Sequence, residues 1–348
     1  MNLPEAGSSE PHKRRPRYQG KNPRKFEDKY KELNPALHPE TVAKVRASGK
    51  TPAGQHVPIM VGEIMEVLAP KAGDRALDCT LGHGGHAAEL LKAVQPDGCL
   101  LGLDQDPIEI EKTAARLREL GFPEATLIVQ RINFAGMRRV LAEQGWHEGA
   151  DVILADLGVS SMQIDNPARG FSFKHEGPLD MRMNPQRGVP ASELLVKMSE
   201  EKLSELLAEN SDEPRAGMLA KALAQRAFMS TTQLAKTVRM ALPYALEEEQ
   251  KEATIRRVFQ ALRIAVNEEF TVLEAWLRDL PHCMVAGGRV AVLTFHSGED
   301  RRVKKAFQAG LREGLYRDVS EEVTRPSSME VRANPRAASA KLRWAVRA

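Results

Sequence analysis

The segment 76–86 constrains the fold more than any other part of this chain. A short apolar run is followed by a turn with glycines at 82, 84 and 85, and then by a helix-forming stretch. A second apolar run, 99–103, ends in Asp104. Glycine lets the backbone turn sharply and approach a ligand closely, and a carboxylate at the end of the second strand is placed to bind ribose hydroxyls. The segment therefore predicts a site for a nucleoside-containing cofactor.

Apolar runs and helical stretches alternate through the first half of the chain, after a short helix at 61–68. The expected strands are 75–79, 99–104, 126–130 and 151–156, and the expected helices are 85–94, 107–120 and 134–144. Such alternation is typical of right-handed crossovers and a parallel sheet covered on both faces. We therefore expect an α/β domain.

The pattern changes after Asp156. Residues 160–187 are rich in Gly, Pro, Asn and Ser and predict a long functional loop, and 190–280 reads as helical. Candidate helix caps are Ser199, Ser230 and Thr254, and one helical face is expected to carry Ile255, Phe259, Leu262, Val266 and Phe270. A strand returns at 290–295 after the turn Gly287-Gly288, and 341–346 reads as a closing edge strand. A helical insert is thus predicted between the fourth and fifth strands.

The charge is unevenly distributed along the chain. Residues 1–50 hold 12 Lys/Arg and 6 Asp/Glu, residues 301–348 hold 12 and 5, and the middle holds 26 and 36. Basic ends around an acidic body are expected either to hold a polyanion or to be solvated tails. The seven prolines and many charges of residues 1–52 predict a flexible extension.

Composition excludes several classes of protein. The chain has no apolar run long enough to span a membrane, its first ten residues lack a secretory core, and its three cysteines have no paired spacing. Cys79, His83 and His86 do not follow a metal-ligand pattern. We expect a cytoplasmic protein without a metal and without a membrane partner, while the oligomeric state, including a dimer, stays open.

Two cofactors are compatible with the glycine turn. The loose pattern Gly82-x-Gly84-x-x-Ala87 suits NAD. However, Asp78 stands beside the turn, where a pyrophosphate would meet its negative charge, and a carboxylate suits the cationic groups of S-adenosylmethionine. The fourth strand also ends in Asp156-Leu157-Gly158, where an amine methyltransferase needs a polar group. These features favour S-adenosylmethionine over NAD.

Several motifs together resemble one family. They are Gly82-His83-Gly84-Gly85-His86, the run 156–163, Arg169-Gly170-Phe171-Ser172-Phe173, the run 177–183, the run 295–301 and Asn334-Pro335-Arg336-Ala337. The chain from about Gln55 onward resembles the bacterial small-subunit ribosomal RNA methyltransferase H family, also called MraW, whereas residues 1–54 lie outside the resemblance. Members of the family methylate the exocyclic N4 of a decoding-centre cytosine of 16S rRNA.

The resemblance implies a Rossmann-like S-adenosylmethionine-dependent methyltransferase fold with an inserted all-helical domain. Its domains would be a basic extension (1–54), a methyltransferase domain (55–165 and 275–348) and a loop and helical insert for substrate recognition (166–274). The cofactor contacts that it implies are Gly84, Gly85, His86, Asp104, Phe134, Asp156 and Gln163. Of these, the turn, Asp104 and Asp156 also follow from the residues themselves.

The substrate would be a cytosine of 16S rRNA, within the small ribosomal subunit or as naked rRNA. Asp156 and Asp180 are candidates for holding the amine or its proton, and His296 is expected to shape the base pocket. The base must leave its stack, so Phe171 and Phe173 are candidates either for stacking or for anchoring the loop. Further RNA contacts are predicted at Arg256, Arg257, Arg263, Arg301, Arg302, Lys304 and Lys305.

Two other functions remain open at this point. A methyltransferase of the same fold could act on another amine, in DNA or protein. An RNA-binding assembly factor could hold the cofactor as a structural ligand. Loss of methylation with retained RNA affinity, on replacing Asp156 or Asp180, separates catalysis from binding alone.

Overall fold

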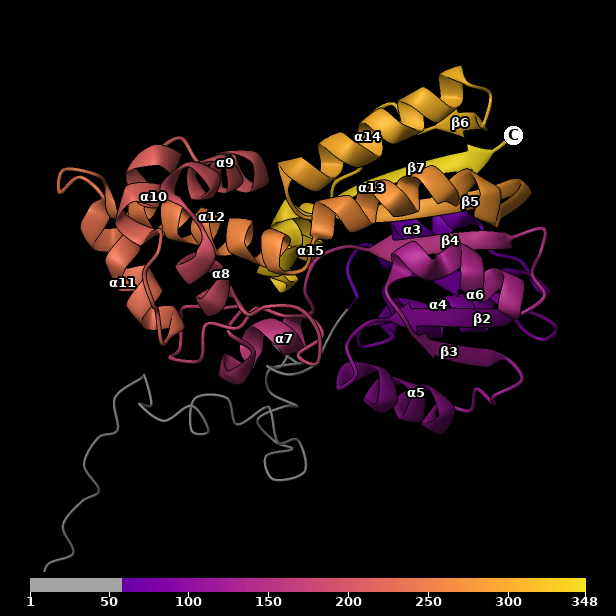
Figure 1. Cartoon of the computed structure of the whole chain (residues 1–348). Helices are drawn as coiled ribbons and strands as arrows, with labels where there is room; N and C mark the ends of the chain where they lie inside the picture. Colours follow the sequence, from indigo (N-terminus) through magenta and orange to yellow (C-terminus); the bar gives the residue numbers. More distant parts are fainter. Residues whose placement is uncertain (1–57) are drawn as a thin grey trace, which may run out of the picture. The chain divides into compact units, whose positions relative to one another are not determined.

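The structure is a computed structural model and describes residues 58–348, so the extension predicted for residues 1–54 lies outside the described residues. Its centre is one seven-stranded sheet (Figure 1). In spatial order the strands are β3 (Leu127–Arg131), β2 (Cys99–Asp104), β1 (Arg75–Asp78), β4 (Ala150–Asp156), β5 (Met284–Thr294), β7 (Lys341–Arg347) and β6 (Tyr316–Val319). The first five are parallel, whereas β7 is antiparallel to both β5 and β6.

Both faces of the sheet are covered by helices, as the alternation along the chain predicts. Successive side chains of a strand point to opposite faces, and in β4 Ile153 belongs to one buried cluster while Leu154 belongs to the other. One cluster includes side chains of α6 (Met137–Glu143), α13 (Glu269–Asp279) and α14 (Ser297–Arg312). The other includes α3 (Val61–Leu68), α4 (Gly85–Val94) and α5 (Glu109–Glu119). This is the Rossmann-like α/β arrangement expected for a methyltransferase.

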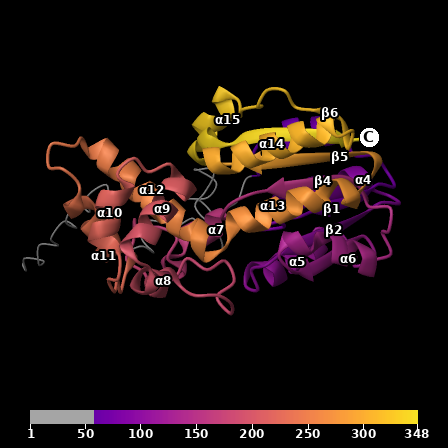
Figure 2. The same cartoon turned by 45° about the horizontal axis from the view of Figure 1, so that its top comes forward.

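A separate group of helices lies between β4 and β5 in the chain (Figure 2). It begins after α7 (Ser161–Asp165) and comprises α8 (Ala191–Lys197), α9 (Glu200–Ser211), α10 (Ala216–Leu223), α11 (Thr231–Ala241) and α12 (Glu248–Val266). These helices bury a third apolar cluster of their own, which includes Leu207, Leu219 and Leu262. In contrast, α13 packs Trp276 and Leu277 into the core of the sheet.

The structure corrects four details of the sequence-based expectations. β7 is not the edge strand, because the short β6 pairs with its outer side. Thr254 caps no helix, since it is buried inside α12, whereas Ser199 and Ser230 are confirmed as caps. The predicted apolar face does not continue to Phe270, because α12 ends at Val266 and Phe270 belongs to α13. β5 begins earlier than expected and contains Gly287 and Gly288 within an irregular pairing with β4.

A 3₁₀ helix, η2 (Phe134–Gly136), follows β3, and α15 (Ser328–Ala333) and η5 (Pro335–Ser339) precede β7. They matter here because each of the two 3₁₀ segments lies at the cavity described next. Within residues 58–348 no helix is both long and apolar enough to cross a bilayer.

Candidate functional site

A cavity of about 480 Å³ lies at the carboxyl ends of the parallel strands. Its walls come from the segments that follow β1, β2, β3, β4 and β5, together with parts of α12, α13 and η5. In an open α/β sheet this edge is where ligands bind. Residues far apart in sequence therefore meet here because the strand order brings their strand ends together.

The glycine turn forms one wall of the cavity. Gly84 has φ +72°, and a Cβ on it would lie 2.7 Å from Thr113 Cγ2 of α5. The N–H of Gly84 donates to Leu81 O at 2.6 Å, and the N–H of Gly82 donates to Asp104 Oδ2 at 2.8 Å. Glycine is thus required at 84 for a left-handed backbone and for the close packing of α5.

Asp104 connects the turn to the end of β2. Its Oδ1 accepts from the N–H of Asp106 at 2.8 Å, while Oδ2 accepts from Gly82. Burial raises the pKa of Asp104 to about 6, even though these two hydrogen bonds act to lower it. Each carboxylate oxygen retains a second lone pair, so Asp104 can still accept hydrogen bonds from a ligand in the cavity.

The other predicted cofactor contacts also lie at the cavity. Gly84, Gly85, His86, Phe134, Asp156 and Gln163 are all among its lining residues. Phe134 packs edge-on against Trp276, with ring centroids 5.8 Å apart. Gln163 forms a capping box with Ser160 at the start of α7. All seven positions that the family resemblance implies are therefore brought together around one cavity.

Asp156 ends β4 in the middle of this sheet edge. Burial raises its pKa to about 7, and the negative charge of Glu299 contributes to the increase. Within residues 58–348 its carboxylate accepts no hydrogen bond, and its nearest basic atom is His86 Nδ1 at 3.6 Å. His86 Nε2 lies 2.9 Å from Ile59 O, so this nitrogen must be the donor. Burial lowers the pKa of His86, which leaves a neutral ring beside Asp156.

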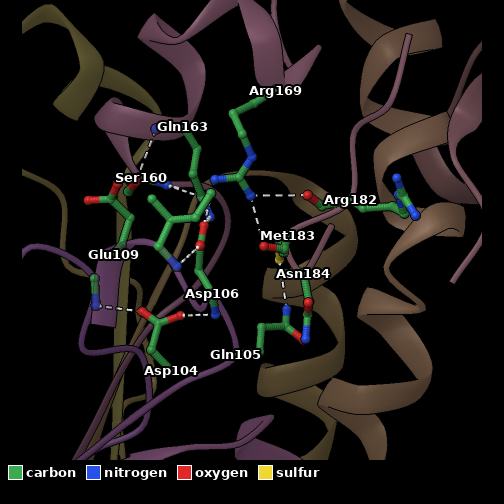
Figure 3. Close-up of polar contacts among 12 residues, drawn as sticks. Asp104, Gln105, Asp106, Glu109, Ser160, Gln163, Arg169, Arg182, Met183 and Asn184 are labelled. Atoms are coloured by element: carbon green, nitrogen blue, oxygen red, sulfur yellow. Dashed lines mark hydrogen bonds and ion pairs between the residues drawn. The ribbon is translucent and has the colours of Figure 1, made fainter. Parts of the chain in front are cut away.

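A buried polar network connects this cofactor wall to the loop before α8 (Figure 3). Asp106 Oδ2 accepts from Gln163 Nε2 at 2.7 Å and from Arg169 Nη1 at 2.8 Å. Arg169 Nη2 donates to the carbonyls of Arg182 and Met183, at 3.1 and 2.8 Å. One guanidinium thus fixes the course of the long loop that the glycine- and proline-rich sequence predicts.

His296 does not line the cavity; it caps α14 instead. Its Nδ1 accepts from the N–H of Glu299, and its Nε2 lies 3.1 Å from Glu299 Oε1. Burial alone would raise the pKa of Glu299, but the contact with His296, the charge of Arg263 and the N–H of Phe295 lower it overall. An ionised Glu299 therefore lines the cavity next to Asp156, with His296 holding it in place.

Three predicted residues of the long loop lie away from the cavity lining. Asp180 forms a two-bond ion pair with Arg182, and although burial raises its pKa, the contacts with Arg182 lower it overall. Phe171 and Phe173 are half-buried against the core of the helical insert, and Phe173 packs on Phe259 with ring centroids 5.1 Å apart. In this structure the two aromatic rings are placed as anchors of the loop.

The predicted RNA-binding arginines are separated by the fold. Arg256 is exposed on α12 and pairs with Glu252, while Arg301 pairs with Asp212 at 3.0 Å. Arg263 instead lines the cavity, where it pairs with Glu269. Sequence reasoning did not identify Glu269, Asn267 and Arg336 as cavity residues. Glu299, which also lines the cavity, was not identified either. Arg336 and Glu299 lie within motifs of the family resemblance, and the spacing of Glu299 from His296 also matches that of a capping box.

The cavity suits a cationic nucleoside better than a pyrophosphate. The N–H groups of Gly82 and Gly84, which a pyrophosphate would need, are already bonded within the protein. The acidic lining residues Asp104, Glu109, Asp156, Glu269 and Glu299 outnumber the arginines, Arg263 and Arg336. Ile132, Phe134, Leu157 and Ile164 supply apolar surface for a flat base. The donor set fits S-adenosylmethionine, and we propose that Asp104 would hold its ribose hydroxyls and Asp156 its sulfonium.

The raised pKa values predict how cofactor affinity depends on pH. The carboxyls of Asp104 (pKa about 6) and Asp156 (about 7) are mostly protonated at pH 5.5 and ionised at pH 8. A cation binds better to the ionised form, so calorimetry should show roughly tenfold tighter binding of S-adenosylmethionine at pH 8 than at pH 5.5.

The demethylated product provides the control, because it has the same ribose but no sulfonium charge. Its affinity should change much less over this range, and the difference between the two ligands should disappear in Asp156→Asn. Equal pH dependence of both ligands in the unaltered protein would contradict a role for Asp156 toward the sulfonium.

Comparison with known proteins agrees with this geometry. Residues 53–348 match the MraW methylase family. A protein of Lachnoclostridium phytofermentans named ribosomal RNA small subunit methyltransferase H 1 is 49% identical over 345 residues, which cover 97% of this chain and 93% of that protein. The protein of the same name from Agathobacter rectalis is 50% identical, with coverage of 97% and 98%.

The family match begins at residue 53, which confirms the predicted start near Gln55. The similarity to the two relatives extends further, because coverage of 97% of this chain must include most of residues 1–52. The family and the cavity also decide between NAD and S-adenosylmethionine, the two cofactors that are compatible with the glycine turn. A methylase needs a methyl donor, and NAD does not donate methyl groups. This chain belongs to the MraW methylase family and is a methyltransferase that uses S-adenosylmethionine.

Proposed function

We propose that this protein methylates the exocyclic N4 of the decoding-centre (P-site) cytosine of 16S rRNA. The names of its relatives specify the RNA of the small ribosomal subunit. The observation that supports an amine acceptor is Asp156, whose carboxylate lines the cavity and accepts no hydrogen bond from residues 58–348. An acceptor without a donor at this position suits a substrate group that brings N–H donors of its own.

The cofactor supplies a methyl group activated by a sulfonium. The nitrogen of an exocyclic cytosine amine is a poor nucleophile because its lone pair is conjugated with the ring. The protein must therefore align nitrogen, carbon and sulfur, which reduces the entropic part of the barrier. Asp156 accepts an N–H of the amine, which directs the lone pair toward the methyl carbon and stabilises the positive charge that develops on nitrogen. As the N–C bond forms and the C–S bond breaks, Asp156 takes the departing proton.

Substrate recognition is assigned to the loop and helical insert, 166–274, and catalysis to segments 55–165 and 275–348. The cavity supports this division, because its far wall comes from α12 and the start of α13. Arg256 on α12 and the cations of α14 are the candidates for the rRNA backbone, since exposed guanidiniums can exchange a carboxylate partner for phosphate. Asp180 forms an ion pair with Arg182, and this pair stabilises the long loop before α8.

Mapping the methyl group tests this function. The purified protein is incubated with labelled S-adenosylmethionine and with small subunits, or naked 16S rRNA, from a strain lacking the enzyme. Digestion and mass spectrometry should find one added methyl, on N4 of a decoding-centre cytosine. A methyl on a ring carbon, on DNA or on protein would contradict the proposal, and binding of RNA without transfer would indicate an assembly factor.

A further inference from the structure

Arg263 is held in an unusual position for an arginine that was expected to bind the RNA backbone. It lies in the last turn of α12, and its side chain is only 17% exposed. Its Nε donates to Glu269 Oε1 at 2.8 Å and its Nη2 to Glu269 Oε2 at 2.9 Å. This pair carries no net charge, so it has little attraction for phosphate. Backbone binding therefore does not explain why an arginine stands here.

The remaining guanidinium nitrogen is available to the cavity. No residue in the described range 58–348 accepts a hydrogen bond from Nη1 of Arg263, and Arg263 and Glu269 both line the cavity. The two-bond pair with Glu269 fixes the plane of the guanidinium and hence the direction of Nη1. The backbone here is also held, since Asn267 Nδ2 donates to Arg263 O and to Met181 O.

Arg263 lies on the substrate side of Asp156. Five of the seven predicted cofactor contacts follow β1, β2 or β3, and Asp156 ends β4, whereas Glu299 follows β5, on the other side of β4. Asp156, Arg263 and Glu299 all line the same cavity. The cavity thus has a second half beyond Asp156, which offers an acceptor at Asp156 and a donor at Arg263.

Cytosine has the complementary pattern of groups on its Watson–Crick edge. Its N4 is a donor, and its N3 and O2 are acceptors. Uracil has an oxygen in place of N4, and this oxygen would face the lone pairs of Asp156 and Glu299. Enzymes that act on an extruded base read it through hydrogen bonds to this edge. A donor and an acceptor held at the two ends of the edge are sufficient to select cytosine.

We infer that Arg263, clamped by Glu269, donates from Nη1 to the N3 or O2 acceptor of the target cytosine and so determines base specificity. This inference rests on the proposed function, because it takes cytosine N4 as the methyl acceptor. It reassigns Arg263 from the RNA backbone to the base. Glu269 acts as a positioning residue, because it contacts Arg263 and does not itself contact the base.

The test pairs an enzyme variant with altered substrate bases. Arg263→Gln is assayed on 16S rRNA in which the target cytosine is unchanged, replaced by 3-deazacytidine (no N3 acceptor) or replaced by 2-thiocytidine (a weaker acceptor at position 2). On cytosine, kcat/KM should fall about 10- to 100-fold, the range for loss of a hydrogen bond from a charged donor. On the analogue that lacks the contacted acceptor, the variant and the unaltered protein should differ less than about threefold.

Control variants show whether the lost activity comes from the contact with the base. Arg139→Gln, on α6 and paired with Glu143 at the surface, should retain full activity. Calorimetric affinity for S-adenosylmethionine should stay within about twofold in Arg263→Gln; a large loss would instead place the guanidinium on the cofactor and overturn the inference. Should Arg263→Gln fail to fold, Glu269→Gln is the alternative, because it loosens the contact with Arg263 but keeps the guanidinium donor. Its kcat/KM on cytosine should fall about 3- to 10-fold. On the analogue that lacks the contacted acceptor, this variant should again differ less from the unaltered protein than it does on cytosine.

The outcomes also separate the two proposals. An equal loss in the variant on cytosine and on both analogues would show that Arg263 does not contact the base edge, even if cytosine N4 is the acceptor. Failure of the unaltered protein to methylate the unchanged cytosine would instead overturn the proposed function itself.

Discussion

Replacing Asp156 by asparagine should lower the rate of methyl transfer about 100- to 1,000-fold, the range for removing one group that stabilises charge in the transition state. Asparagine has nearly the same shape, but its amide cannot take the amine proton. Its NH₂ group could also face the substrate N–H groups as a second donor. Single-turnover transfer from bound S-adenosylmethionine to small subunits measures this step without product release.

The pH profile identifies the group responsible. In the protein without ligands, burial raises the pKa of Asp156 to about 7, so the carboxylate is protonated below this pH and accepts no proton. The single-turnover rate should therefore rise with pH, with a midpoint below 7 because the bound cation favours the ionised form. This rise should be absent in Asp156→Asn.

Asp151→Asn is the matched control. Asp151 lies on the same strand at the end away from the cavity, where it accepts from the N–H of Arg75 at 2.8 Å. Asparagine can keep this contact, so the rate of methyl transfer and its pH profile should be unchanged.

The folded pKa of Asp156 exceeds its ordinary value, so its ionisation costs folding stability as the pH rises toward 7. Asp156→Asn should thus unfold no more easily than the unaltered protein at pH 8, and an unaltered rate in this variant would remove Asp156 from the mechanism.

Most of the sheet could be predicted from sequence because its signals are local. The first four strands lie within one residue of their expected ends, since each is an apolar run closed by a turn or a carboxylate. β6 was missed because Tyr316–Val319 is four residues long and exposes its two middle side chains. Its pairing with β7 depends on contacts between distant segments, which no local pattern records.

The cofactor wall could be predicted for a similar reason. Asp104 and Asp156 each end a strand, and parallel strands end at the same edge, so sequence alone places them together. Arg263 and Arg256 show the opposite case. They lie seven residues apart on one helix and look equivalent in sequence, yet one faces the cavity and the other is exposed. Only the packing of α12 against α13 and the long loop distinguishes them.

Replacing Arg169 by methionine should lower the free energy of unfolding by about 3–5 kcal/mol, the usual cost of removing one partner from a buried ion pair. The side chains of Arg169 and Asp106 are only 8% and 1% exposed. Methionine would leave the Asp106 carboxylate buried without its cation and the carbonyls of Arg182 and Met183 without their donor. Urea unfolding measures the loss, and hydrogen exchange should increase at residues 169–184 before it increases in the sheet.

Two further variants show whether burial of the ion pair between Arg169 and Asp106 accounts for the expected loss of stability. Arg118→Met breaks an exposed pair with Glu124, with side chains 47% and 80% exposed, and should cost less than about 1 kcal/mol. Adding Asp106→Asn to Arg169→Met removes the unpaired buried charge, so the double variant should be more stable than Arg169→Met alone. If Arg169→Met instead costs no more than Arg118→Met, the network in Figure 3 does not hold the loop.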